Sequence, residues 1–257
     1  MKLVLPDFSA VCIDDGNTRC KVGVFLRGEL SKLYVLPTRT SDALFSIPEI
    51  KEEILPVIWS SVSVSRTIFE NLHRERALVF EAGVELDLPI KNRYRRPGPG
   101  SDRLCAAVAA HAFFKGSPVL AIDAGTCLKF DFVSAGGVYL GGSISPGLQM
   151  RYDSMHRGTG RLPLLSATDA VEAELVGDHT EAAMRSGALL GIRMETEGRI
   201  ACYHSLYPDV KVILTGGGLE DLRISLKKNI FAEPNLVLYG LLILLYHQPK
   251  IKALIHS

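Results

Sequence analysis

Two stretches of the chain carry the same signature: residues 11–30 read VCIDDGNTRCKVGVFLRGEL, and residues 119–140 read VLAIDAGTCLKFDFVSAGGVYL. In each stretch an apolar segment ends in an aspartate, a tight polar turn follows, and apolar residues then alternate along a second segment. This pattern predicts a β-hairpin in each stretch, followed in the second by a turn at Gly136-Gly137 and a third strand. Because Ile13-Asp14-x-Gly16 recurs as Ile122-Asp123-x-Gly125, the sequence predicts two homologous halves.

Breaker residues and apolar runs indicate further elements around the two hairpins. Residues 97–100 (PGPG) precede DRLCAAVAAHAFF, so we expect a helix over residues 102–114 that places Asp102 near an exposed helix start. The short apolar run at residues 210–214 predicts a strand. Weaker patterns predict the remaining elements, which are helices at residues 41–50, 66–76, 168–176 and 180–203 and a polar strand at residues 58–64.

The longest apolar run is LVLYGLLILLY at residues 236–246, which has 11 residues, whereas a membrane span needs about 20. We therefore expect a buried C-terminal helix there and no membrane partner. The second signature begins directly after Ser117-Pro118, so we place a domain boundary at that point. The expected domains are residues 1–117 and residues 118–257.

Composition narrows the class of protein. With 257 residues, 47% of them hydrophobic and 22% charged, the chain is neither disordered nor collagen-like and can build a sizeable core. A formal net charge of +1 without a basic block gives no field for nucleic acid, which favours a small-molecule role. The five cysteines are odd in number and lack a Cys-x-x-Cys pair, so we expect neither a disulfide framework nor a zinc site, and a cytoplasmic location.

The repeated turn has the groups that a magnesium nucleotide requires. An aspartate at a strand end, followed by glycine and then asparagine or threonine, brings backbone N–H groups and a hydroxyl toward one point, while the carboxylate can hold a hydrated cation. Phosphoryl transfer depends on positioning and on neutralising phosphate charge, so two such turns facing each other across a cleft would form a phosphate clamp. A single Asp-x-Gly turn is also a common hairpin connection, and each copy alone leaves that alternative open.

Two further features have two interpretations each. Lys21 either reaches a phosphate as a point charge or lies on a solvated strand face. Residues 216–218, three glycines after an apolar run, either let the backbone approach a ligand or form a turn from strand to helix. For the glycine-rich residues 141–147 we favour a packing role, because small residues let strand and helix approach closely.

Asp102 is the candidate for the group that accepts a proton from an attacking hydroxyl. Its alternative role is that of an acidic residue favoured at a helix start by the helix dipole. Just upstream, residues 92–96 (NRYRR) form a basic and aromatic patch that suits an acidic substrate. The same patch could be a solvated turn or a weak RNA contact, although one aromatic residue offers little for stacking bases.

Six segments along the chain match one family. They are Asp14-Asp15-Gly16-Asn17-Thr18 with Lys21, Gly100-Ser101-Asp102-Arg103, Asp123-Ala124-Gly125-Thr126, residues 139–148 (YLGGSISPGL), Thr159-x-x-Leu162-Pro163, and Thr180 before Ser186-Gly187. With these segments in this order between residues 11 and 218, the chain resembles the type III pantothenate kinases, which belong to the acetate and sugar kinase, Hsp70 and actin superfamily.

The resemblance implies an α/β fold of two RNase H-like domains, as in the actin-like ATPases, with a nucleotide cleft between them. It also implies the reaction, which is ATP-dependent phosphorylation of the 4′-hydroxyl of pantothenate to 4′-phosphopantothenate, the first step of coenzyme A synthesis. ATP would bind with Mg²⁺, and a monovalent cation, K⁺ or NH₄⁺, would be required as well. The expected partners are ATP, pantothenate and a second copy of the chain in a homodimer, with no nucleic acid and no membrane.

Site residues follow from the resemblance position by position. The implied ATP-binding residues are Asp14, Asp15, Gly16, Asn17, Thr18, Arg19, Cys20, Lys21 and Thr126. Asp102 would be the general base, and Asp123 would bind the monovalent cation. The implied pantothenate-binding residues are Tyr94, Gly100, Ser101, Asp102, Arg103 and Thr180.

The chain departs from the family pattern at Asp15, where an apolar residue is usual. A second carboxylate there would repel phosphates unless it points away or helps to hold a metal ion. Cys127 replaces a frequent alanine, and the loop from Tyr94 to Gly100 is one residue shorter than usual. Two other functions stay open from sequence: a non-catalytic transcription accessory factor of the same family, and a sugar or acetate kinase of the same superfamily.

Overall fold

The computed structural model describes residues 7–37, 41–52, 55–61, 72, 78–169, 172–218, 222 and 230–255. The chain forms two compact units. Unit 1 comprises residues 1–116, 133–141 and 235–257, and unit 2 comprises residues 117–132 and 142–234. The chain first passes into unit 2 after Gly116, one residue from the domain boundary that we placed, whereas residues 235–257, which we assigned to the second domain, join unit 1.

Unit 1 is built on a five-stranded sheet with the strand order β3-β2-β1-β4-β5. The strands are β1 (Ala10–Asp15), β2 (Arg19–Leu26), β3 (Glu29–Pro37), β4 (Val57–Ser61) and β5 (Val79–Glu81). Strands β1, β2 and β3 form an antiparallel meander, and β4 and β5 continue the sheet in parallel with β1. The hairpin predicted from residues 11–30 is therefore confirmed.

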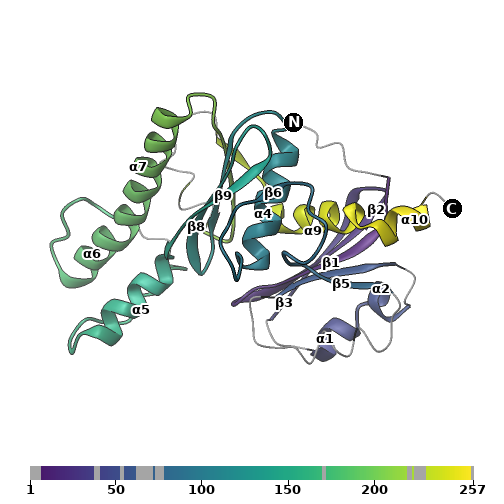
Figure 1. Cartoon of the computed structure of the whole chain (residues 1–257). Coiled ribbons are helices and arrows are strands. Elements are labelled where there is room, and N and C mark those ends of the chain that lie inside the picture. Colours follow the sequence, from purple (N-terminus) through teal and green to yellow (C-terminus); the bar gives the residue numbers. More distant parts are fainter. Residues whose placement is uncertain are drawn as a thin grey trace. The chain divides into compact units, whose positions relative to one another are not determined.

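Helices cover both faces of this sheet (Figure 1). One face carries α4 (Ser101–Phe113) and α9 (Leu236–His247), which pack against each other and against strands β1, β2 and β4; α10 (Pro249–Ile255) follows and packs on α9. The other face carries α1 (Ser41–Phe45) and α2 (Pro48–Lys51), whose Leu44 and Ile50 join Val11 and Ile13 in one apolar cluster. Pro48 at the start of α2 divides the single helix that we expected over residues 41–50.

The tight packing of α9 on α4 explains why the C-terminal residues belong to unit 1. A Cβ atom at Gly240 would lie 1.9 Å from the carbonyl oxygen of Cys105, so only glycine permits this approach of the two helices. The helices predicted over residues 102–114 and 236–246 are confirmed. Within the described residues, no helix has both the length and the apolar character needed to cross a bilayer.

The second sheet has six strands in the order β11-β10-β7-β8-β9-β6. They are β6 (Lys91–Asn92), β7 (Val119–Ala124), β8 (Cys127–Val133), β9 (Val138–Pro146), β10 (Lys211–Thr215) and β11 (Ile230–Ala232). Within unit 1, β6 pairs in parallel with the first residues of β9. Within unit 2, β10 pairs in parallel with β7 and β11, which confirms the strand predicted at residues 210–214.

The core of unit 2 lies on one face of β7, β8 and β10. Leu120, Ile122, Phe130 and Leu214 point to this face and pack against Ile192 on α7 (Gly191–Leu206). Unit 2 also contains α5 (Leu148–Gly158) and a helical run from α6 (Thr180–Arg185) through a π-helical turn (Ser186–Leu190) into α7. This run confirms the helix predicted over residues 180–203.

Three predicted segments differ from the structure or lie at least partly outside the described residues. The helix expected over residues 168–176 is wrong, since the described residues of this stretch form turns and bends. Leu175 and Val176 are 74% and 78% exposed, so these two apolar side chains contribute little packing that could stabilise a helix there. The expected helix at residues 66–76 lies outside the described residues, except for Leu72, and so does the end of the strand expected at residues 58–64.

Candidate active site

The first repeated turn connects β1 to β2. The side chains at the ends of these two strands point alternately to the two faces of the sheet. Successive strand residues point to opposite faces, and neighbours in register share a face. Asp14 is in register with Lys21 on β2 and with Ser60 on β4, so these three side chains lie on the face that α4 and α9 cover. A carboxylate and an ammonium thus stand at the end of the sheet beside the start of α4.

Asp15 points to the opposite face. It is in register with Cys20 and Ser61, it is 2% exposed, and the hydroxyl of Ser61 donates a hydrogen bond of 3.1 Å to its Oδ2. Burial first, and then the charges of Asp15 and Asp14, raises the pKa of Cys20 to about 12, so Cys20 is a neutral thiol at physiological pH. The side chains of Asp15 and Cys20 are therefore part of the interior, while those of Asn17, Thr18 and Arg19 in the same turn are exposed.

The start of α4 is tied to the sheet at the same end. The hydroxyls of Ser60 and Ser101 share a hydrogen bond of 2.8 Å, which links β4 to the first residue of α4. Asp102, the next residue, is half-buried in the first turn of the helix, and its Oδ1 accepts a hydrogen bond of 2.8 Å from the backbone N–H of Arg103. A Cβ atom at Gly100 would lie 2.7 Å from this Oδ1, so glycine leaves room for the carboxylate.

Asp14 and Asp102 lie in the same part of unit 1, near the buried thiol of Cys105. Burial is the main cause that raises the pKa of the Cys105 thiol, and the charges of Asp14 and Asp102 raise it further. Asp14 is directly in register with Ser60, whose hydroxyl is hydrogen-bonded to that of Ser101, the residue before Asp102. Unit 1 therefore brings Asp14 and Asp102, which are 88 positions apart in the sequence, to one place.

Arg103 and Tyr94 form the neighbouring part of the site. The guanidinium of Arg103, a residue that is only 6% exposed, donates a hydrogen bond of 3.2 Å to the hydroxyl of Tyr94 and lies 5.4 Å from the centre of the Tyr94 ring. The other partner of this ring is Tyr139 on β9, which stacks on it at 6.0 Å. Gly141 leaves space for Tyr94, since a Cβ atom there would lie 3.0 Å from the ring. The first turn of α4 thus presents a buried cation, and the loop before it presents a phenol, beside Asp102.

The second repeated turn lies in unit 2 between β7 and β8. Its carbonyls accept three backbone hydrogen bonds, from Gly125 to Cys127 at 3.1 Å, from Gly147 to Thr126 at 3.1 Å and from Gly218 to Ala124 at 2.7 Å. Cβ atoms at Gly142 and Gly147 would overlap the backbone of β8 and of this turn, which supports the packing role that we favoured for residues 141–147. Gly216 and Gly218 likewise pack against the turn, and Thr126 is exposed at its tip.

Asp123 is ion-paired in this second turn. The Nζ of Lys129 on β8 lies 2.8 Å from Asp123 Oδ2. Sequence reasoning missed Lys129, although the repeat held the signal. Once the one-residue difference in turn length is allowed for, Lys129 occupies the position in the second copy that Lys21 occupies in the first.

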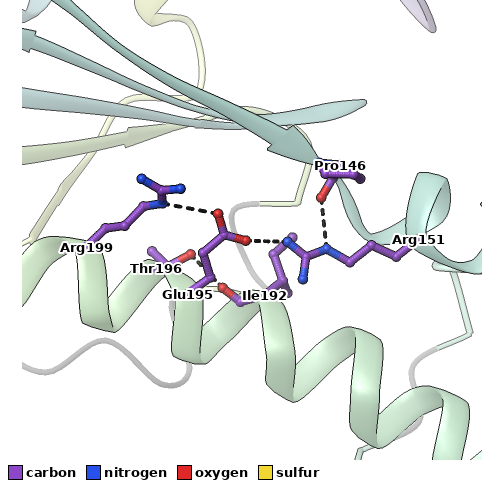
Figure 2. Close-up of polar contacts among 6 residues, drawn as sticks. All are labelled: Pro146, Arg151, Ile192, Glu195, Thr196 and Arg199. Carbon is purple, nitrogen blue, oxygen red and sulfur yellow. Dashed lines mark hydrogen bonds and ion pairs between the residues drawn. The ribbon is translucent and has the colours of Figure 1, made fainter.

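Thr180, the remaining predicted substrate residue, is the exposed first residue of α6 in unit 2. The helical run that it begins is anchored by a network around Glu195 on α7 (Figure 2). Arg151 on α5 binds Glu195 and also donates a hydrogen bond of 2.9 Å to the carbonyl of Pro146 at the end of β9. Arg199 donates a second hydrogen bond of 3.1 Å to Glu195 and stacks over the Phe130 ring.

The residues fit a divalent cation better than they fit a monovalent one. No cluster of three His, Cys, Asp or Glu side chains that could hold a metal ion exists among the described residues. Mg²⁺ needs no such cluster in phosphoryl-transfer enzymes, because one or two carboxylates and the substrate phosphates hold it, and Asp14 has that chemistry. Asp123, the predicted ligand of a monovalent cation, already has Lys129 at one carboxylate oxygen.

Comparison with solved structures places this fold in a class. A structure described as a conserved putative Baf family transcriptional activator from Campylobacter jejuni matches with a TM-score of 0.55 and 17% identity, covering 90% of this chain and 94% of the other. The activator of the 2-hydroxyisocaproyl-CoA dehydratase from Clostridium difficile with bound ADPNP matches with a TM-score of 0.54 and 12% identity, covering 96% and 97%. At these identities the likeness shows the fold alone, which is that of the actin-like ATPases and sugar kinases and confirms the predicted fold class.

Sequence comparison identifies the family within that class. Residues 10–201 match the family described as type III pantothenate kinase. The type III pantothenate kinase of Christiangramia forsetii is 39% identical over 235 residues, covering 89% of this chain and 94% of the relative. The enzyme of the same name from Phocaeicola vulgatus is 37% identical over 240 residues, covering 93% and 98%. The chain belongs to the type III pantothenate kinase family.

Proposed function

We propose that this protein transfers the γ-phosphoryl group of ATP to the 4′-hydroxyl of pantothenate, forming ADP and 4′-phosphopantothenate in the first step of coenzyme A synthesis. Membership of the family supports the reaction class. Within the chain, the observation that carries the proposal is the placement of Asp102 beside the Arg103–Tyr94 pair and near Asp14, through the Ser60–Ser101 hydrogen bond of unit 1. The names of the relatives do not favour a non-catalytic transcription factor.

Asp102 acts as the general base. Its carboxylate accepts the proton of the 4′-hydroxyl while that oxygen forms a bond to the γ-phosphorus and the bond from the γ-phosphorus to the bridging oxygen of ADP breaks. The backbone N–H of Arg103 holds Oδ1 of Asp102, which fixes the direction of the carboxylate. The Ser60–Ser101 hydrogen bond keeps this first helical turn against the sheet.

The two repeated turns bind ATP. Residues 14–21 of the first turn and Thr126 of the second contact the phosphates, with Lys21 as a point charge. The carboxylate of Asp14 would hold Mg²⁺, and the bound ion would neutralise charge on the phosphate oxygens. Asp15 and Cys20 contribute through their backbone, because their side chains are buried in unit 1.

Pantothenate carries a carboxylate, and Arg103 is the cation suited to bind it, since guanidinium and carboxylate form paired hydrogen bonds. Tyr94 orients Arg103 and, with Gly100 and Ser101, forms the wall of the substrate site. Thr180 of unit 2 completes the set of substrate residues. The proposal includes a homodimer and a cytoplasmic location.

The test is release of ADP with pantothenate as acceptor, measured for the wild-type protein and for Asp102→Asn. The asparagine is nearly isosteric but cannot accept the proton, so kcat is expected to fall by a factor on the order of 100 or more. Asp87→Asn is the matched control, because Asp87 is exposed in unit 1 and only its backbone is hydrogen-bonded to Gln248. Full activity of Asp102→Asn would remove the general base from the proposal, and absence of pantothenate-dependent ADP release from the wild type would overturn the function.

A further inference from the structure

In unit 2, the side-chain ammonium of Lys129 forms an ion pair with Asp123. Lys129 Nζ lies 2.8 Å from Asp123 Oδ2, and the two side chains are 17% and 18% exposed, so water and salt screen this contact only in part. Both side chains lie on the same face of the sheet, opposite the face that carries Leu120, Ile122 and Phe130. The strands β7 and β8 therefore hold the ammonium in place.

The second oxygen of Asp123 lies next to two glycines. Cβ atoms at Gly216 and Gly125 would lie 2.5 Å and 3.2 Å from Oδ1, so the two glycines border this oxygen closely. One oxygen of the carboxylate thus faces glycine backbone and the other faces Lys129. A free cation bound to Asp123 would stand beside the Lys129 ammonium, and two like charges next to one carboxylate repel each other.

From this arrangement we infer that the side-chain ammonium of Lys129 takes the place of the monovalent cation, and that phosphoryl transfer by this protein needs no added K⁺ or NH₄⁺. The inference rests on the proposed function. A primary ammonium has the single positive charge of K⁺ and is an alkylated form of NH₄⁺, so it supplies the same charge to the second turn. Because it is tethered to β8, it does not depend on the concentration of a soluble ion.

The repeated sequence signature supports this role for Lys129. Lys21 follows the first turn where Lys129 follows the second, and Lys21 is directly in register with Asp14 across β1 and β2. Each copy of the signature therefore brings its own lysine to its own strand-end aspartate. In the first copy the lysine is placed for phosphate, and in the second it neutralises Asp123.

The experiment compares the wild type with Lys129→Thr, which removes the ammonium, leaves space for an ion and adds a hydroxyl oxygen as a possible ligand. Lys211→Thr is the matched control, because Lys211 is an exposed lysine at the start of β10 in the same unit. ADP release is measured at constant ionic strength in tetramethylammonium, potassium and ammonium chloride. We expect the wild type and the control to vary by less than about twofold among the salts, and Lys129→Thr to lose about tenfold or more in tetramethylammonium and to recover in potassium or ammonium.

A second measurement does not depend on activity. An ion that binds only the folded state stabilises it by RT ln(1 + [ion]/Kd), so potassium chloride should raise the Tm of Lys129→Thr above its value in tetramethylammonium chloride and leave the wild-type Tm unchanged. Stimulation of the wild type by potassium, or a potassium-dependent rise in its Tm, would overturn the inference. Absence of ADP release in every salt would overturn the proposed function instead, and the Tm comparison would still decide the role of Lys129.

Discussion

Asp14 and Asp15 are adjacent in the sequence, yet their side chains lie on opposite faces of the first sheet. Asp14 shares its face with Lys21 and Ser60, and Asp15 accepts a hydrogen bond from Ser61 on the other side. The alternation of a β-strand is enough to separate them. This arrangement answers the question raised by a second carboxylate beside the phosphates, because the carboxylate of Asp15 points away from the face of Asp14 and Lys21.

Asparagine substitutions at the two positions should therefore differ in effect. Asp14→Asn removes the carboxylate that we assign to Mg²⁺, and kcat/KM for ATP is expected to fall by about a hundredfold, as for other electrostatic groups at phosphoryl-transfer sites. Asp15→Asn keeps an oxygen that can accept from Ser61, so ATP kinetics should change by less than about threefold and the free energy of unfolding by about 1 kcal/mol. Steady-state kinetics and urea unfolding measure the two quantities, and a larger kinetic loss in Asp15→Asn would contradict the face assignment.

Tyr94 is expected to act on substrate binding through Arg103. Tyr94→Phe removes the hydroxyl that accepts from Arg103 but keeps the ring that stacks on Tyr139. A lost hydrogen bond of about 1 kcal/mol corresponds to a rise of roughly fivefold in KM for pantothenate, with kcat nearly unchanged.

Tyr207→Phe serves as the control, because it removes a hydroxyl in unit 2 while its ring still packs on Phe132. A fall in kcat at constant KM in Tyr94→Phe would mean that the phenol acts in the chemical step and not in binding.

Gly216 and Gly217 provide a matched pair for the second turn. Gly216 has a φ of +98°, and its Cβ would lie 2.5 Å from Asp123 Oδ1, whereas a Cβ at Gly217 meets nothing within 4 Å. Gly216→Ala is expected to destabilise the protein by about 1–3 kcal/mol through backbone strain and to displace Asp123, while Gly217→Ala should stay within about 0.5 kcal/mol of the wild type. Thermal unfolding and ADP release measure both effects. Equal behaviour of the two variants would show that the turn tolerates a side chain beside Asp123.

Much of the fold could be predicted from local sequence, because several strands and helices have clear hydrophobic patterns or clear boundary residues. The hairpin at residues 11–30 and the helix that begins at Ser101 follow from alternation and from the PGPG breaker. The packing of residues 235–257 in unit 1 could not be predicted in this way, since it depends on the contact of Gly240 with Cys105, far away in the sequence. The stretch at residues 168–176 has a helical pattern, but Leu175 and Val176 stay exposed and no helix forms over its described residues.

The candidate site was predictable to a similar extent. Short motifs gave Asp14, Asp102 and Arg103, and unit 1 brings them close together. Sequence motifs do not show which face a side chain occupies or which charge it meets. The burial of Asp15 and the ion pair of Asp123 are therefore seen only in the structure. Strand alternation was a sequence signal for the first, and the repeated lysine was a signal for the second.

Glu195 should give the stability of unit 2 a dependence on pH. Burial raises the pKa of Glu195, but the hydrogen bond from Arg151, the charge of Arg151 and the hydrogen bond from Arg199 outweigh it and hold this pKa below its ordinary value (Figure 2). Because the folded-state pKa is the lower one, the contribution is complete above the unfolded-state pKa and is lost as the pH falls through the folded-state pKa. Glu195→Gln is expected to lower the free energy of unfolding at neutral pH by about 1 kcal/mol, a value near the upper end for ion pairs that water reaches, and this difference should shrink in acid.

Glu197→Gln, an exposed position on the same helix, is the control for the loss of a negative charge. Urea unfolding across the acid range makes the comparison, and a difference between the wild type and Glu195→Gln that persists unchanged in acid would show that the pairing with Arg151 does not stabilise the fold.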